Sequence, residues 1–323
     1  MAARLSVCMI VRDESAVLDR CLASLAGLVD ELCIVDTGSV DDTPSIARRH
    51  GARMASFTAC NDDQGRIVDF ALARNAALAM ATGEWVLQID ADEVLEAGAD
   101  RVRHWLRSGE ADCVAVRMKS GGAEWVSQRL FRRAQASTYR SRIHEYVECG
   151  GIAARDVGIR IVNLQDKRGK ESSSDRNRRL CELALAENPD DARILFYLAG
   201  ENRKAGKLQE AVEQFTRCIA LGTFRQGLYR AMFQLGACHL MLGRWAAAMD
   251  AARSAIALDG RYAEGYCLLA DACACSERLD EARRHYRTAL ACTPPADALF
   301  PVEGWAYDAH PRRRLAAMGA LPA

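Results

Sequence analysis

The sequence lacks the features that direct a protein to a membrane or to nucleic acid. No apolar run approaches the roughly 20 residues that a bilayer-spanning helix needs. Neither charge is in excess, because 43 Lys plus Arg balance 43 Asp plus Glu among the 323 residues. The first 12 residues lack a cleavage pattern and predict a strand rather than a signal peptide. We therefore expect no membrane span and no nucleic-acid partner.

Paired cysteines are also missing. The 13 cysteines are scattered, odd in number and never spaced C-x-x-C, whereas zinc sites are built from ligand pairs. Cys8, Cys33, Cys113 and Cys218 lie in apolar runs and are expected to be small core residues. A reduced, cytoplasmic environment is the expected compartment.

Strands and helices are predicted to alternate through the first half of the chain. The apolar runs predict strands at 5–11, 32–35, 53–57 and 85–89. Helical spacing predicts helices at 17–25, 44–50 and 67–81. This order predicts an α/β domain with a mostly parallel sheet and right-handed crossovers.

The predicted strand at 85–89 runs directly into three carboxylates, Asp90, Asp92 and Glu93. Buried acids are costly unless something positive meets them, and ligands bind at the carboxyl ends of strands in such sheets. Alternation along an extended chain sends Asp90 and Asp92 the same way. Two carboxylates aimed at one point suit Mg²⁺ or Mn²⁺, with phosphate oxygens completing the site. The alternative is an acidic turn that caps a helix beginning near Ala97.

A second acidic strand end is predicted at Asp36. The residue follows the run 32–35 and opens a polar loop that continues to Thr43, with Gly38 for a tight turn. In a parallel sheet, Asp36 and the carboxylates after residue 89 face the same crevice.

Five segments together resemble family 2 glycosyltransferases of GT-A fold: Ser6–Glu14, Val35–Thr43, Phe70–Asn75, Gly83–Trp85 and Asp90–Glu93. The resemblance implies an enzyme that binds a nucleotide-sugar, with a metal bridging the diphosphate. It implies that Asp36 contacts the nucleotide base and that Asp90 and Asp92 form the metal and ribose site. Family members often have Lys-Asn-Glu where this chain has Arg12-Asp13-Glu14.

Arg74 and Asn75 match the family pattern on the helix before the acidic motif. The functional interpretation is a cation and an amide near the diphosphate of the donor. The alternative is a surface arginine paired with Asp69 or Glu84.

The acceptor side is expected after a strand at 113–118 and its hairpin partner at 124–133. Similar relatives carry an Ile-His-Glu sequence here, as at Ile143-His144-Glu145. An inverting sugar transfer needs a base that takes the acceptor proton. Glu145 or His144 can serve, His144 can instead bind the metal, and Glu93 is a third catalytic candidate. The alternative for the His-Glu pair is an ordinary ion pair.

A strand at 159–164 is expected to close this domain. Relatives often carry His where this chain has Asn163, and Asn is the poorer metal ligand. The polar run 165–175 that follows is expected to be a connector or a lid over the donor.

From Arg176 onward the period becomes helical, and small residues recur. Ala199, Gly236 and Ala270 are equivalent positions, 37 and 34 residues apart. The pattern resembles tetratricopeptide repeats from Asp191 to Pro295. Such a stack binds a peptide or a second subunit on its concave face, or it braces the catalytic domain. Residues 301–323 are expected to form a terminal helix that caps the stack, with the arginines at 312–314 pointing outward.

These observations predict an α/β GT-A domain followed by an all-α tetratricopeptide-repeat domain. The expected boundaries are 1–168 for the GT-A domain, 169–190 for a linker and first helix, 191–295 for the repeats and 296–323 for a cap. The predicted function is a metal-dependent inverting glycosyltransferase that uses a nucleotide-sugar, a UDP-sugar by preference, and a peptide, protein or glycan acceptor. The alternative is a non-catalytic repeat protein with a degenerate GT-A domain, and the repeats also suggest a homodimer.

Overall fold

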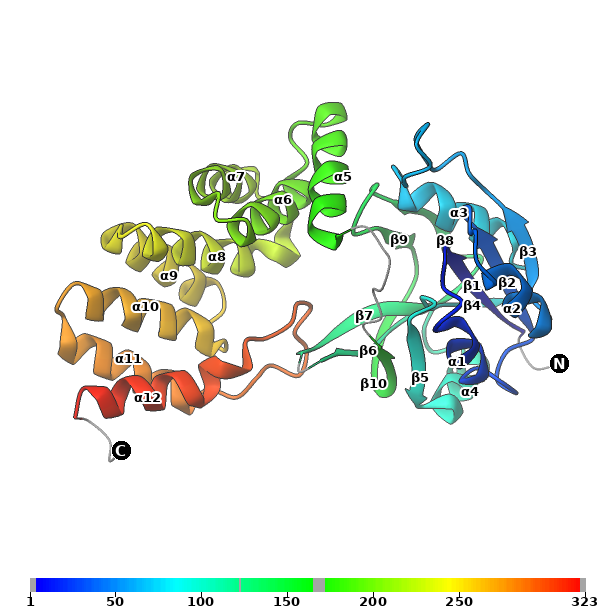
Figure 1. The fold of residues 1–323 in the computed structure, drawn as a ribbon. Coiled ribbons are helices and arrows are strands. Elements are labelled where there is room, and N and C mark those ends of the chain that lie inside the picture. The colour runs from blue at the N-terminus through cyan, green and yellow to red at the C-terminus, as the bar shows by residue number, and fades with distance from the viewer. Residues whose placement is uncertain (1–3, 122, 165–171, 320–323) are drawn as a thin grey trace. The chain divides into compact units, whose positions relative to one another are not determined.

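The computed structural model describes residues 4–121, 123–164 and 172–319. The chain divides into two compact units, Met1–Lys170 and Glu171–Ala323 (Figure 1). No helix in the part of the chain that the structure describes has the length and apolar character of a membrane span. The predicted connector at 165–175 lies mostly outside the described residues, and its last three residues begin helix α5 (Ser173–Glu187).

An eight-stranded sheet organises the first unit, in the order β3-β2-β1-β4-β7-β6-β10-β5. Its strands are β1 (Leu5–Val11), β2 (Glu31–Asp36), β3 (Arg53–Ser56), β4 (Trp85–Gln88), β5 (Glu93–Ala97), β6 (Cys113–Ser120), β7 (Ala123–Arg132) and β10 (Ala153–Asn163). Neighbours from β3 to β4 are parallel. Beyond β4 the sheet is mixed, because β7 pairs antiparallel with both β4 and β6. The predicted α/β class and the β6–β7 hairpin are confirmed.

Helices cover both faces of the sheet, which explains the continuous apolar character of β1. Its odd-numbered residues pack in one cluster with α1 (Leu18–Ala23), α2 (Thr43–Arg49) and α4 (Ala99–Ser108). Cys8 and Cys33 pack in another cluster with α3 (Phe70–Met80). The four cysteines predicted to lie in the core are buried. All 13 cysteines, each within the described residues, are free thiols.

The segment after Glu93 differs from the alternative of an acidic turn that caps a helix beginning near Ala97. Residues Glu93–Ala97 form β5, which pairs antiparallel with β10. Gly98 then reverses the chain with φ +96°, and a Cβ there would lie 2.6 Å from the Cα of Ile159. Only glycine fits this approach. Helix α4 therefore begins at Ala99, and the acidic motif is anchored on both sides by strands.

A smaller two-stranded sheet carries the candidate acceptor residues. Strand β8 (Ala136–Arg140) pairs antiparallel with β9 (Tyr146–Cys149). The chain between these strands, residues 141–145, contains the Ile-His-Glu sequence.

The second unit is a stack of helix pairs, which confirms the predicted all-α repeat domain (Figure 1). The pairs are α6 (Ala192–Lys204) with α7 (Leu208–Leu221), α8 (Leu228–Met241) with α9 (Trp245–Leu258), and α10 (Ala263–Cys275) with α11 (Leu279–Ala291). Small residues sit at the crossings: Ala199 and Ala270 are fully buried, and a Cβ on Gly236 would lie 2.6 Å from the Leu268 side chain.

The turn inside each helix pair has the same left-handed residue. Gly206 and Gly243 have φ of +76° and +72°, and the third copy places Glu277 at φ +62°. In all three, the next residue's N–H bonds a carbonyl five residues back at 2.9 Å, as Arg278 does to Cys273. The three repeats therefore share the same turn geometry, although the third repeat has Glu277 where the other two have glycine.

Replacing Glu277 with Gly is expected to stabilise the repeat unit by up to about 1 kcal/mol. A non-glycine residue in the left-handed region costs roughly 1–2 kcal/mol, and the greater entropy loss of glycine offsets part of that gain. Urea unfolding followed by helical circular dichroism measures the change. Glu277→Ala, which removes the same exposed side chain but keeps Cβ, is the matched control. Equal stability of the two variants would argue against backbone strain.

Helix α12 (Ala309–Ala317) packs on the last repeat through fully buried Leu315. The prediction that all three arginines at 312–314 point outward is wrong for Arg314. Its Nε donates to Tyr286 Oη at 2.9 Å and lies 3.4 Å from Asp271 Oδ1. Arg314 precedes the buried Leu315, so it lies at the margin of the packed face, where a long side chain reaches polar partners.

Candidate functional site

Both acidic strand ends lie at one edge of the parallel part of the sheet. Asp36 is the last residue of β2, and Asp90 follows β4 by two residues. Strand β1 lies between these two strands and is parallel to each. The two acidic strand ends are therefore separated by a single strand at the same edge of the sheet.

Asp36 uses one carboxylate oxygen to hold the loop that follows it. Oδ1 accepts hydrogen bonds from Ser39 Oγ at 2.7 Å and Ser39 N at 2.9 Å. Gly38 N donates to the same oxygen at 3.3 Å, with φ +110° at Gly38. This is an Asx-type turn, and it fixes the direction in which the Asp36 side chain leaves the sheet.

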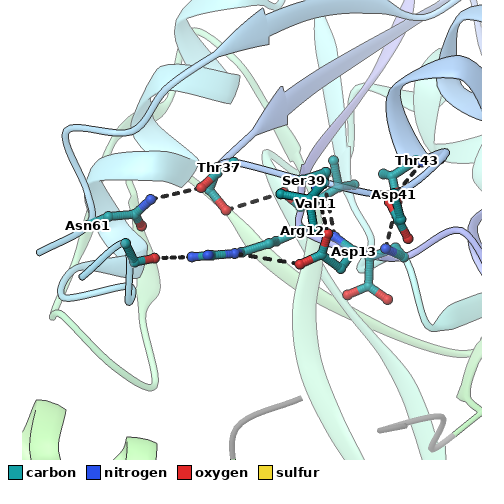
Figure 2. A network of polar contacts seen from close by, with 12 residues as sticks. Val11, Arg12, Asp13, Thr37, Ser39, Asp41, Thr43 and Asn61 are labelled. Atoms are coloured by element: carbon teal, nitrogen blue, oxygen red, sulfur yellow. Dashed lines mark hydrogen bonds and ion pairs between the residues drawn. The ribbon is translucent and has the colours of Figure 1, made fainter. Parts of the chain in front are cut away.

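A polar network joins this loop to the end of β1 (Figure 2). Thr37 donates to the carbonyl of Val11 from N at 3.0 Å and from Oγ1 at 3.2 Å. Asp13 N donates to Ser39 Oγ at 3.0 Å, and Val40 N donates to Asp13 Oδ1 at 2.8 Å. Asp13 has a φ of +51°, a strained conformation that the surrounding bonds stabilise.

The same network extends to the segment after β3 (Figure 2). Asn61 Nδ2 donates to the carbonyl of Thr37 at 2.8 Å, and Arg12 donates to the carbonyl of Gly65. Ser15 N and Thr43 N both donate to Asp41. Although burial opposes it, these partners lower the pKa of Asp41 to about 2. The network therefore links the three loops that follow β1, β2 and β3, next to Asp36.

The acidic motif is met by two buried arginines. Arg74 Nη2 lies 2.9 Å from Asp90 Oδ1, and Arg129 Nη1 lies 3.7 Å from Asp90 Oδ2. Arg129 Nη2 also donates to Glu93 Oε1 at 2.8 Å, while Asp90 N donates to Glu93 Oε2 at 2.9 Å. Arg74, Arg129 and Glu93 are 8%, 9% and 3% exposed. The structure thus supplies the positive charge that buried carboxylates need.

Burial and nearby charges shift the pKa values of Asp90 and Glu93 in opposite directions. Burial alone would raise the pKa of Asp90, but Arg74 and Arg129 outweigh it and lower that pKa. For Glu93, burial raises the pKa to about 7, and the nearby charges of Asp90 and Asp92 act in the same direction, against Arg129. The pKa values of the two acids of one motif are therefore shifted in opposite directions.

Sequence reasoning missed Arg129. Strand β7 skips this residue in its pairing with β6, because Val114 pairs with Leu130 and Ala115 pairs with Gln128. An extra residue of this kind is a β-bulge, which redirects a side chain. Alternation along the strand does not predict where Arg129 points, and no local signal in the sequence marks the bulge.

Arg74 bridges the acidic motif and the loop at residues 141–145, called the acceptor loop here because it carries the predicted acceptor-side residues. Its Nε pairs with Glu145 Oε1 as its Nη2 pairs with Asp90. The alternative of a surface arginine paired with Asp69 or Glu84 is wrong. Asp69 caps α3 by accepting from Leu72 N at 3.0 Å, and Glu84 pairs with Arg132.

Both the nitrogen and the oxygen of the Asn75 side-chain amide form hydrogen bonds with the backbone of Tyr139. Its Nδ2 donates to the carbonyl of Tyr139 at 3.0 Å, and its Oδ1 accepts from Tyr139 N at 2.7 Å. Asn75 therefore clamps β8 onto α3, and Phe70 N adds a second tie by donating to the carbonyl of Arg142 at 2.9 Å. In this structure, Asn75 positions the acceptor loop.

The acceptor loop itself is strained. Ser141 and His144 have φ of +76° and +52° within four residues. Non-glycine residues in this region cost about 1–3 kcal/mol each and gather at functional sites. The half-buried Glu145 side chain follows these two residues and pairs with Arg74.

Asp90 and Asp92 are the two carboxylates that the sequence predicts to hold a divalent cation. Both oxygens of Asp90 face arginines, and among the described residues no three His, Cys, Asp or Glu side chains form a metal cluster. A cation site at Asp90 and Asp92 therefore stays a prediction, and it would need phosphate oxygens and water to complete its ligands. Asn163 pairs in register with Glu93, and Leu164 N donates to the carbonyl of Asp92 at 2.8 Å, so the end of β10 borders this position.

Comparison with known proteins identifies the first unit. Residues 6–162 match the family described as Glycosyl transferase family 2. This part of the chain is a family 2 glycosyltransferase domain. The glycosyltransferase domain thus contains the strand ends, both arginines and the acceptor loop described above.

Over most of its length the chain is similar to proteins that are longer. Over 274 residues it is 32% identical to a TPR repeat-containing protein of Synechococcus elongatus. The alignment covers 79% of this chain and 66% of that protein. Over 232 residues it is 25% identical to the SPbeta prophage-derived glycosyltransferase SunS of Bacillus subtilis, covering 65% of this chain and 52% of SunS. The chain therefore spans between half and two thirds of the length of these curated relatives.

Solved structures give more distant similarities. The crystal structure of MamA is 22% identical and covers 46% of this chain and 80% of that chain, with a TM-score of 0.38. The crystal structure of S. aureus TarS is 14% identical and covers 82% of this chain and 55% of that chain, with a TM-score of 0.44.

Proposed function

We propose that this protein transfers a sugar from a nucleotide-sugar to an acceptor, with inversion and with a divalent cation. The observation that carries the proposal is the placement of Asp36 and the Asp90–Glu93 motif at one edge of the sheet, after the two strands that flank β1, in a family 2 glycosyltransferase domain. Ligands of open α/β sheets bind at that edge. A UDP-sugar is the proposed donor.

Each part of the donor is proposed to contact one residue of this site. Asp36, on its fixed loop, is proposed to contact the nucleotide base. Asp90 is proposed to contact the ribose, in the orientation that Arg74 and Arg129 impose. Asp92 is proposed to hold Mg²⁺ or Mn²⁺, which when bound neutralises charge on the leaving diphosphate.

Glu145 is proposed as the base that takes the acceptor proton. Arg74 links its carboxylate to Asp90, so the acceptor loop and the donor motif keep a fixed relation. Such alignment supplies a large part of the rate enhancement when two substrates react. His144 is the alternative base, and it lies next to Glu145 in the same strained loop. Burial raises the pKa of Glu93 to about 7. Glu93 is proposed to hold Asp90 in place by accepting the hydrogen bond from the Asp90 N–H, rather than to contact substrate.

The acceptor is proposed to be a peptide or protein. Helical repeat stacks of this type present extended surfaces that suit polypeptides. A glycan acceptor is the competing proposal, and acceptor screens with each class distinguish the two.

Donor binding is expected to raise the thermal midpoint of the protein. The test uses UDP-, GDP- and dTDP-sugars, each with and without Mn²⁺. A ligand at 100 times its dissociation constant stabilises the folded state by about 2.7 kcal/mol. A metal-dependent shift with one nucleotide class supports the proposal and names the nucleotide. Absence of any shift would instead favour a non-catalytic repeat protein, in which the two arginines satisfy Asp90 permanently.

A further inference from the structure

The segment that follows α11 returns along the first helix of each repeat pair. The ring of Phe300 lies 5.4 Å from the ring of Phe196 on α6 and 6.1 Å from that of Phe224, between centroids. Arg193 stacks on Phe224 from the same side of the stack, 5.1 Å from the ring centroid. The first repeat therefore holds an aromatic side chain from the far end of the chain.

Glu303 continues the path onto the next two repeats. Its carboxylate pairs with Arg230 on α8, and its N–H donates to Glu264 Oε1 on α10 at 2.8 Å. Tyr307 Oη then donates to Glu264 Oε2 at 2.9 Å. Contacts therefore pass in order from α6 through α8 to α10, each the first helix of its pair.

The last contacts lie farther along α10. The carbonyl of Ala306 accepts from Cys267 Sγ at 3.4 Å, and His310 Nε2 lies 2.9 Å from Asp271 Oδ2. The ribbon shows the segment between α11 and α12 in orange and red (Figure 1). Residues Phe300–His310, here called the return segment, thus cover the face formed by α6, α8 and α10.

Glu264 is the main polar anchor of the return segment on this face. The residue is fully buried, and a buried carboxylate requires hydrogen-bonding partners. Two of its partners, Glu303 N and Tyr307 Oη, come from the return segment. Arg230 lies at 3.8 Å, the outer limit of an ion pair. Departure of the return segment would therefore remove two hydrogen-bond donors and the cover from Glu264, and an external peptide would have to replace them.

We propose that the α6–α8–α10 face is a polypeptide-binding groove and that the return segment is its built-in occupant. The groove takes an extended peptide with an aromatic residue three positions before an acidic one, as in Phe300-Pro-Val-Glu303. An external peptide of this chemistry binds only when the return segment leaves. The groove is thus closed in the resting chain, unlike the open concave face that the repeats alone predict.

The expected size of the effect follows from the tether. A segment attached to its own groove acts at a millimolar effective concentration, and the apparent affinity of a competitor falls by the fraction of open molecules. Weakening the return segment is therefore expected to increase external peptide affinity about 10-fold or more.

The test uses the full chain and a fluorescent peptide with the sequence of residues 297–308. The double variant Phe300→Ala, Glu303→Ala removes the aromatic and the ionic contact of the return segment and leaves the groove intact. Fluorescence anisotropy is expected to show at least 10-fold tighter binding than to the unaltered chain. Leu299→Ala is the matched control: this neighbouring side chain is 42% exposed, and its loss is expected to change nothing. A peptide with Ala in place of Phe300 should bind weakly to every chain.

Two results would overturn the proposal. One is a folded double variant, verified by circular dichroism, that binds the peptide no better than the unaltered chain. The other is equal tight binding to all chains. If the double variant does not fold, Glu303→Gln is expected to increase binding in the same direction, and no increase there would also reject the built-in occupant.

Discussion

Replacing Asp92 with Ala is expected to lower kcat/KM for sugar transfer by about 100- to 1,000-fold or more. The loss follows because Asp92 is the proposed protein ligand of the cation, while both oxygens of Asp90 face arginines. Steady-state transfer, or donor hydrolysis in the absence of acceptor, measures the effect in the presence of Mn²⁺. The metal-dependent thermal shift with donor is expected to disappear in the same variant.

The fold is expected to survive this change. Asp92 lies half-buried in a turn, and its backbone carbonyl keeps the bond from Leu164 N. Glu96→Ala is the matched control, because Glu96 is an exposed acid on the same β5 segment that pairs with Arg160. We expect the control to retain full activity. Full activity in Asp92→Ala would reject the assignment of the cation to this residue.

Replacing Arg74 with Ala is expected to destabilise the first unit by about 3–5 kcal/mol, the usual effect of removing one partner from a buried ion pair. Arg74 is 8% exposed and faces both Asp90 and Glu145, so its loss leaves two partly buried carboxylates with less positive charge. Urea unfolding followed by tryptophan fluorescence measures the change, because Trp85 is fully buried in β4.

Two comparisons separate this buried network from ordinary ion pairs. Arg103→Ala removes a 42%-exposed arginine side chain on α4 that pairs with Asp100, and it is expected to cost at most about 1 kcal/mol. A double-mutant cycle between Arg74 and Glu145 is expected to give a coupling energy of about 0.5–3 kcal/mol. Additive effects in that cycle would mean that Arg74 does not link the acceptor loop to the donor motif.

Local patterns in the sequence predicted the elements of both units. Continuous apolar runs marked β1 and β4 because both faces of those strands are covered by the rest of the protein. The recurrence of small residues marked the helix crossings of the repeats because only small side chains allow that approach. The positions of Asp36 and Asp90 at strand ends followed from the same reasoning, since parallel strands place those ends at one edge.

The sequence placed Arg74 and Asn75 together but did not separate their contacts. Neighbours on a helix point about 100° apart, so one reaches the acidic motif while the other clamps Tyr139. Which of them meets a carboxylate depends on where β8 lies against α3. That placement involves residues more than 60 positions apart.

Tertiary structure alone decided the features with no local signature. Arg129 reaches Asp90 because a bulge in β7 redirects it, and β5 exists because β10 returns to pair with it. The return segment covers the repeats because Glu303 binds Glu264 and Phe300 packs against Phe196, residues that lie far apart in the sequence. Each of these depends on contacts between distant parts of the sequence. Local periodicity determined which residues form the elements, while long-range pairing determined which charges and rings meet.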